Sequence, residues 1–155
     1  MLINMEGTSP PPDDPALRDA AAILERATAD ELAASDLRER LGRDGLPRLE
    51  ADDTIRPHLG DGEHVVEVRD VVVAERFDGD GRLDTLSARL YLTTERLLLV
   101  GADRIAIPLA AIDEVSLAGE RVLLSLRDGS GWRLDAGWPR LLRVQVAAAR
   151  AGVPA

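Results

Sequence analysis

The sequence predicts a mainly β protein with helices: seven antiparallel strands in a small barrel or a pair of orthogonal sheets, capped by a C-terminal helix and preceded by a helical hairpin. Two observations predict this class. Between residues 63 and 135, short apolar runs with a period of two alternate with turns that contain Gly and Asp. After residue 138, apolar residues instead recur every three or four positions, which indicates a helix.

The amino-terminal region divides into a tail and a helical arm. Residues 1–13 are rich in proline and show no period, so we expect a disordered tail there. The arm covers residues 14–43. Asp14 followed by Pro15 is typical of a helix start, because Asp caps the first turn and Pro suits its first position.

The arm is predicted to contain two helices. Thr28-Ala-Asp-Glu31 has the form of a capping box, which indicates that a second helix begins there. Two interpretations of the arm stay open: a hairpin that packs on the main domain, or a dimerisation or docking arm. The residues expected on the apolar stripes, and the glycine expected to end the second helix, are Leu17, Ala21, Leu24, Leu32, Leu37, Leu41 and Gly42.

Residues 44–62 are rich in Gly, Pro and Asp and are predicted to form a linker, held on the core by Ile55 and Leu59. The main domain is expected over residues 63–151. Its first strand carries Val66 and Val68 on one parity and Val71 and Val73 on the other. This change predicts a bulge at Arg69-Asp70.

The second strand alternates clearly, with Arg89, Tyr91 and Thr93 expected to point away from the core. Thr93-Thr-Glu-Arg96 is predicted to be a hairpin corner, after which Leu97–Val100 returns beside the second strand. Pro108 is expected at a sheet edge or a strand end, because it cannot donate a ladder hydrogen bond. The core-facing residues expected on the second and later strands are Leu86, Ala88, Leu90, Leu92, Ile105, Ile107, Leu109, Ile112, Val115, Leu117, Val122, Leu124, Leu126, Trp132 and Leu134.

The last element is predicted to be a helix from Pro139 to about Arg150, since proline suits the first helical position. Its apolar residues Leu141, Leu142, Val146 and Ala149 recur at helical spacing. This helix is expected to cover one open end of the barrel.

Composition argues against several functions. The chain of 155 residues has no Cys and a formal net charge of −9, which disfavours thiolate chemistry, nucleic-acid binding and anionic membranes. Neither a secretion signal nor a membrane-spanning run of about 18 apolar residues is seen. A cytoplasmic protein is therefore expected.

No motif of catalysis or cofactor binding stands out, so a non-enzymatic protein without cofactor or metal is expected. The acidic run Asp78, Asp80, Gly81 and Asp84 resembles a calcium loop. That alignment places Arg76 and Ser87 where calcium requires carboxylates, so a hairpin turn is favoured. The two histidines, His58 and His64, are too few for a zinc site without carboxylate help, and they are expected at the surface.

Three segments together resemble the GRAM and bacterial PH-like domains. They are GEHVVEV at Gly62–Val68, ARLYLTTERLLLVG at Ala88–Gly101, and IAIPLAAIDEVSL at Ile105–Leu117. The resemblance covers about residues 59–151 and implies a PH-type fold of seven strands and a capping helix. It also implies an adaptor role, because such domains bind lipids or proteins. Lipid-binding members carry Lys and Arg in the loop between the first two strands, whereas the loop Phe77–Asp84 is acidic, so phosphoinositide binding does not carry over.

Aromatic residues are the candidates for partner binding. Tyr91 is the better exposed candidate. For Trp132 and Trp138, packing beneath the last helix is favoured over a role as exposed anchors, although tryptophan is common at binding hot spots. The sequence hypothesis is a non-enzymatic adaptor for protein interaction or assembly, with self-association through the amino-terminal helices as one form. Peripheral lipid binding and an unrecognised enzyme are the alternatives.

Overall fold

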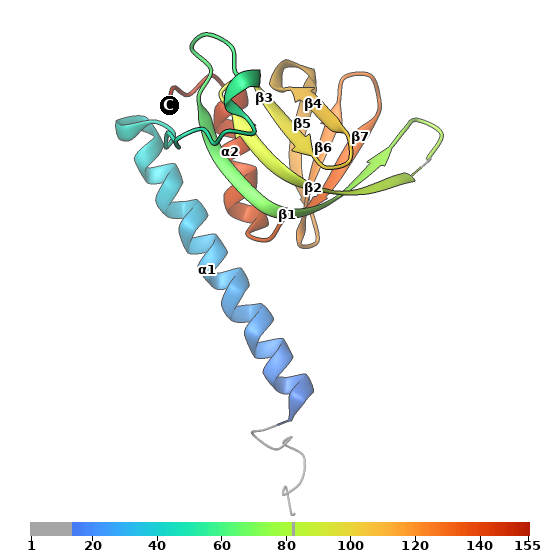
Figure 1. Cartoon of the computed structure of the whole chain (residues 1–155). Helices are drawn as coiled ribbons and strands as arrows, with labels where there is room; N and C mark the ends of the chain where they lie inside the picture. The colour runs from blue at the N-terminus through green and yellow to red at the C-terminus, as the bar shows by residue number, and fades with distance from the viewer. Residues whose placement is uncertain (1–13, 82) are drawn as a thin grey trace, which may run out of the picture.

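A computed structural model describes residues 14–81 and 83–155 of the chain, so the predicted tail over residues 1–13 lies outside the described part. A long helix, α1, leads into a curved β-sheet, and a shorter helix, α2, lies between α1 and the sheet (Figure 1). The helices and strands are α1 (Pro15–Asp44), β1 (Val65–Phe77), β2 (Leu83–Thr93), β3 (Arg96–Val100), β4 (Arg104–Pro108), β5 (Ile112–Ala118), β6 (Arg121–Leu126), β7 (Gly131–Asp135) and α2 (Pro139–Arg150), with short 3-10 turns at η1 (Arg56–His58) and η2 (Leu109–Ala111).

The seven strands form one antiparallel sheet in the order β4-β3-β2-β1-β7-β6-β5. The predicted mainly β class, strand number and C-terminal helix are confirmed. The sheet is not a closed barrel, because no pairing joins its two outermost strands, β4 and β5, within the described residues. Pro108 ends the outer strand β4, as expected of a residue that cannot donate to a ladder.

Strand β1 bends where the sequence predicted a bulge. Its register with β2 shifts between Arg69 and Val72, and a second shift lies between Val65 and Glu67. The bulges change which parity faces the core: Val72 is fully buried, whereas Val71 is exposed to solvent. The same change leaves Val73 exposed, so the valines of this strand could not be assigned to faces by alternation alone.

Both faces of the sheet carry buried residues along the neighbouring strands β2 and β3. Leu90 and Leu92 belong to the main core, as predicted, together with residues of every other strand. On the opposite face Tyr91 and Leu98 pack beneath Ile55, which the segment after α1 supplies. The linker is therefore a cover for the second face of the sheet, and the predicted anchoring by Ile55 and Leu59 is confirmed.

The predicted helical hairpin is wrong, because α1 is one continuous helix of 30 residues. Its start is confirmed: Asp14 caps it and Pro15 takes the first position. The Thr28 hydroxyl donates to the carbonyl oxygen of Leu24 at 2.9 Å instead of capping a new helix. No proline interrupts this alanine-rich stretch, so its high helix propensity carries the helix past Gly42 to Asp44.

Helix α2 packs on both sides. Leu142 and Val146 enter the main core of the sheet, as predicted. On its other side Val144 packs against Ala34 and Leu37 of α1. The carboxyl half of α1 is thus held on the domain through α2.

Gly45 is required at the end of α1. Its φ of 71° lies in the left-handed region, and a Cβ there would stand 2.5 Å from the carbonyl oxygen of Pro154. We expect Gly45→Ala to lower the free energy of unfolding by about 2 kcal/mol, measured by urea denaturation. Gly42→Ala is the matched control, because Gly42 is helical with no atom within 4 Å of the added Cβ. It should raise stability by up to about 1 kcal/mol, and equal effects of the two changes would contradict this explanation.

Candidate interaction surface

Tyr91 is not an exposed binding residue. Its side chain is 0% exposed, and its hydroxyl donates to Asp52 Oδ2 at 2.7 Å. Burial, followed by this hydrogen bond, raises the pKa of Tyr91, while the same bond is the main cause that lowers the pKa of Asp52. Tyr91 does point away from the main core, as predicted. The prediction that it is exposed is wrong, because the linker residue Ile55 covers that face of the sheet.

Trp132 lies in the main core, as the favoured interpretation had it, and the guanidinium of Arg76 lies 5.8 Å from its ring centroid. Trp138 behaves differently. Its side chain is 46% exposed, so the prediction that it packs beneath α2 is wrong. It precedes α2 in the N-cap position with φ 46° and ψ 54°, which is unusual for a bulky residue.

The cap of α2 comes from α1. Trp138 supplies no side-chain hydrogen bond to the helix it precedes. Instead, Asp30 Oδ2 accepts from the backbone N–H of Arg140 at 2.8 Å, and Asp30 Oδ1 accepts from that of Leu141 at 2.9 Å. A carboxylate is well suited to these amides, because helix N-termini leave N–H groups unpaired and carry partial positive charge.

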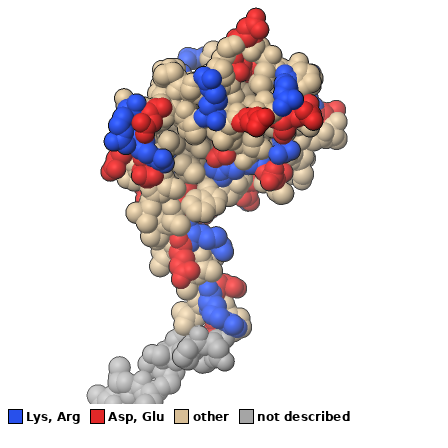
Figure 2. Space-filling model, turned by 60° about the vertical axis from the view of Figure 1, so that its left-hand side comes forward, with Lys and Arg blue, Asp and Glu red and all other residues tan. Residues whose placement is uncertain are grey.

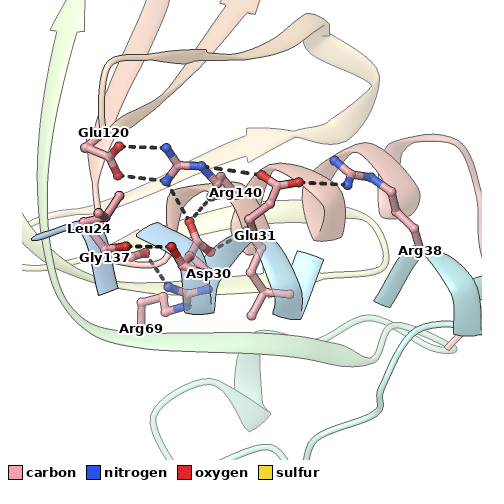
Figure 3. A network of polar contacts seen from close by, with 10 residues as sticks. Leu24, Asp30, Glu31, Arg38, Arg69, Glu120, Gly137 and Arg140 are labelled. Atoms are coloured by element: carbon pink, nitrogen blue, oxygen red, sulfur yellow. Dashed lines mark hydrogen bonds and ion pairs between the residues drawn. The ribbon is translucent and has the colours of Figure 1, made fainter. Parts of the chain in front are cut away.

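Arg140 links the two helices to the sheet (Figure 3). Its guanidinium binds both carboxylate oxygens of Glu120, at 2.8 and 3.0 Å, in the turn between β5 and β6. It also lies 3.4 Å from Asp30 and 3.6 Å from Glu31 of α1. Hydrogen bonding to Arg140 lowers the pKa of Glu120, and the same bond raises that of Arg140.

Arg69, at the bulge of β1, holds the segment before Trp138. Its Nη1 donates to the carbonyl oxygen of Gly137 at 2.6 Å and lies 3.4 Å from that of Ala136. The segment is therefore held through its carbonyls by β1, and the first turn of α2 is held through its amides by α1. These contacts from both sides stabilise the left-handed backbone at Trp138.

A groove of about 370 Å³ lies between α1 and this turn. Its apolar lining includes Trp138, Ile23 and Ala27, and its charged lining includes Arg26 and Asp135. Apolar surface with a few charged groups around it is typical of protein-binding sites.

The amino-terminal half of α1, residues 15–29, extends beyond the sheet and beyond α2 (Figure 1). We call it the free half of α1. Its side chains are exposed or half-buried, and the large apolar ones, Leu17, Ile23 and Leu24, are all exposed. Charged residues of both signs are interspersed over the domain and along the helix (Figure 2). This apolar surface continues into the groove at Ile23.

A second polar cluster, around Glu63, is structural. The Glu63 side chain is fully buried and accepts hydrogen bonds from the hydroxyl of Thr93 at 2.6 Å and from the amide of Gly60 at 2.9 Å. Arg96 donates to both carboxylate oxygens through Nε and Nη2, each at 2.9 Å. Burial raises the pKa of Glu63, but the bonds from Arg96, Gly60 and Thr93 outweigh it and hold the pKa below its ordinary value.

This cluster forms the hairpin corner predicted at Thr93-Thr-Glu-Arg96. The Thr93 hydroxyl also accepts from the amides of Glu95 and Arg96, so it closes the turn between β2 and β3. Glu63 and Arg96 stand in the segments Gly62–Val68 and Ala88–Gly101, two of the three compared above with GRAM and PH-like domains. They lock the start of β1 to this turn, and they form no open site.

The histidines and the acidic loop lie elsewhere. His58 is exposed and contacts Arg104 at 2.6 Å, whereas the backbone of His64 pairs with Thr94. Asp78 forms a turn in which its carboxylate accepts from the amide of Asp80 at 2.9 Å, as the hairpin prediction had it. Within residues 14–81 and 83–155, no group of three or more His, Asp or Glu could hold a metal ion.

Sequence reasoning missed the residues that build this surface. Asp30 was only an intervening residue of the predicted capping box Thr28–Glu31, although it caps a helix 110 positions further along the chain. Glu120 and Arg140 have no local pattern that pairs them. The one available signal was Trp138 before Pro139, which indicated a helix start without a side-chain cap.

No helix in the described part of the chain has the length and apolar character needed to cross a membrane. No protein-family model matches the sequence, and no curated protein matches it significantly.

Replacement of Asp30 tests its role as a remote cap. Asp30→Ala would leave two amides of α2 unpaired and Arg140 without one of its partners. We expect a loss of about 2–3 kcal/mol in the free energy of unfolding, measured by urea denaturation. Asp36→Ala is the matched control on the same helix, where an exposed pair with Arg40 is removed. It should cost less than about 1 kcal/mol, and a similar loss in both variants would count against the cap.

Replacement of Glu63 tests the buried ion pair and its pH dependence. Because its folded-state pKa lies below the ordinary value of 4.5, Glu63 contributes stability above pH 4.5, and this contribution is lost as the pH falls through the folded-state pKa. Glu63→Gln should lower the free energy of unfolding at pH 7 by about 3 kcal/mol. It should also make stability less sensitive to acid below pH 4.5.

The measurement is urea denaturation from pH 7 down to pH 3, with Glu114→Gln as the control at an exposed glutamate of β5. That control should follow the unmodified protein at every pH. An unchanged acid dependence in Glu63→Gln would show that Glu63 is not the group responsible.

Proposed function

We propose that this protein is a non-enzymatic PH-like module of the GRAM type that acts as a cytoplasmic adaptor for protein interaction or assembly. The support for the fold is the seven-stranded antiparallel sheet followed by a C-terminal helix, together with the sequence resemblance over about residues 59–151. The support for the function is the apolar surface formed by the free half of α1 and Trp138.

The single observation that carries the function is the exposure of large apolar side chains in one place. Scattered exposed leucines are ordinary, but a continuous apolar surface on a helix that contacts little of its own chain is typical of a binding surface. Leu17 and Leu24 are exposed to solvent, so they add little packing energy to the fold of their own domain. These residues stabilise a complex once a partner covers them.

Trp138 adds a second reason. A left-handed backbone at a bulky residue costs on the order of 1 kcal/mol, and glycine would avoid this cost. Contacts from Asp30 and Arg69 hold the turn in that form and leave the Trp138 side chain half exposed at the groove. Tryptophan is among the residues that are enriched at the hot spots of protein interfaces.

The acidic character of the chain argues for a protein partner and against an anionic membrane. With a net charge of −9, the molecule as a whole is repelled by anionic lipid. The surface of the free half of α1 carries Arg18 and Arg26 beside Asp19 and Glu25, so it has no excess of positive charge.

Site-specific photocrosslinking in the native host tests the proposal. A photoreactive residue at position 24 or 138 should form covalent adducts with protein. The same residue at position 32 is the matched control, because Leu32 is 67% exposed and Leu24 68%, on the same helix but outside its free half. Adducts at 24 and 138 with few at 32 are expected. Absence of protein adducts at 24 and 138, or equal labelling at all three, would refute the proposed surface.

The variant Trp138→Gly separates binding from folding. Glycine relieves the left-handed backbone while the partly exposed ring is lost, so the free energy of unfolding should change by less than about 1 kcal/mol. Crosslinking from position 24 should nevertheless fall. A variant that crosslinks as strongly as the unmodified protein would exclude Trp138 from the binding surface.

A further inference from the structure

We propose that the outer strand β4 binds an extended peptide segment of a partner protein, which adds to the sheet as a further strand and places aliphatic side chains in a hollow beside β4. This site is separate from the surface formed by α1 and Trp138, and it therefore goes beyond the proposed function. Two features of the molecule point to it: backbone groups that face away from the sheet, and the shape and chemistry of the hollow next to them.

The free edge of β4 offers backbone groups for a further strand. Leu109, the residue after β4, donates its amide to the carbonyl oxygen of Glu95, the residue before β3, at 3.0 Å. This bond continues the ladder between the two strands, so the odd-numbered residues of β4 turn their backbone groups toward β3. The even-numbered residues Arg104 and Ala106 turn theirs outward. Within the described residues, no strand pairs with β4 on that side.

A hollow of about 290 Å³ lies beside this edge. Ile105 and Ile107 of β4 form one apolar wall, and Leu126 and Trp132 belong to the other. Ala106 also lines the hollow, which therefore adjoins the outward backbone groups. Residues of an added strand that lie opposite the two isoleucines would point to the same face of the sheet, and hence into the hollow. The site thus fits a segment with aliphatic residues at alternate positions.

The charged residues at the hollow are Arg76 and Asp128, one of each sign. The guanidinium of Arg76 lies 5.8 Å from the ring centroid of Trp132. The carboxylate of Asp128 accepts hydrogen bonds from the amide and the hydroxyl of Ser130. Both charged groups are thus engaged by the protein itself, and their charges cancel. We therefore expect backbone hydrogen bonds and apolar contacts, rather than charge, to determine which segment binds.

The other outer strand, β5, is protected against such pairing. Its register with β6 shifts between Ile112 and Glu114, and the side chains of Asp113 and Glu114 are exposed at this point. Bulges and charged side chains are two of the ways in which proteins protect the edges of their sheets. The register of β4 has no such shift, and no charged residue lies between Arg104 and Pro108 at its two ends. Of the two edges, β4 is therefore the one open to a further strand.

Selection from a library of random short peptides displayed on phage, with the full chain as bait, tests the proposal. The enriched sequences should carry Val, Ile or Leu at alternate positions, because only those side chains enter the hollow. An enriched peptide, synthesised and titrated by isothermal calorimetry, should bind with a Kd in the micromolar range, since the edge of β4 is only five residues long.

The outward amide of Ala106 is tested by substitution. Ala106→Pro removes this amide without removing a bond of the sheet, because proline is tolerated on edge strands where the N–H faces solvent. It should weaken binding of the enriched peptide by about tenfold or more. Ala106→Ser keeps the amide at the same exposed position and should bind as the unmodified protein does. Urea denaturation shows whether both variants fold.

Hydrogen exchange measured by NMR tests the same edge without any substitution. In the free protein, the amides of Arg104 and Ala106 should exchange rapidly and those of Ile105 and Ile107 slowly, because only the isoleucines pair with β3. The enriched peptide should slow exchange at Ala106.

The inference is overturned if no peptide with this alternation is enriched, if Ala106→Pro and Ala106→Ser bind equally, or if the peptide leaves exchange at Ala106 unchanged. Protection of Ala106 that increases with protein concentration alone also overturns it, because a second copy of the chain would then occupy the edge. Peptide binding at β4 would stand even if photocrosslinking at positions 24 and 138 failed, since the two surfaces share no residues.

Discussion

Asp30 is the residue on which the arrangement of the two helices depends. Its buried carboxylate caps α2 from α1, because Trp138 supplies no cap of its own. An unpaired charge at this depth would be costly, so the two helices keep one relative position. That position determines which part of α1 is covered and which part remains free. It also holds Trp138 at the edge of the groove, and the candidate surface is therefore a consequence of this contact.

The segments Gly62–Val68 and Ala88–Gly101 are joined in this structure by a buried polar cluster. Glu63 and Arg96 form a buried ion pair, and Thr93 closes the hairpin while it binds the same carboxylate. These residues join the start of β1 to the corner between β2 and β3. These side chains bind one another and nearby backbone groups, so their pattern in the sequence indicates how the chain folds. It carries no information about a partner, which must be recognised by exposed residues elsewhere.

The sequence predicted which face of the sheet a strand residue lies on better than it predicted whether that residue is exposed. Alternation placed Leu90 and Tyr91 on opposite sides of β2 correctly, and yet both are buried. Tyr91 is covered because Ile55 and its neighbours pack on the face of the sheet opposite the main core. Asp52 accepts a hydrogen bond from the Tyr91 hydroxyl. The pattern of one strand cannot reveal a cover that comes from a distant segment. The same limitation applies to β1, where two register shifts moved Val72 into the core in place of Val71.

By itself, the sequence determined the class of the protein, the number of strands, the hairpin corner at Thr93–Arg96 and the start of each helix, since period, turn residues and capping residues act locally. The tertiary structure decided that α1 is one helix, that Tyr91 is buried and that Trp138 is exposed. These outcomes depend on contacts between distant residues, such as Asp30 with Arg140. A carboxylate that caps another helix has the same local pattern as one that caps its own, and only the folded chain distinguishes them.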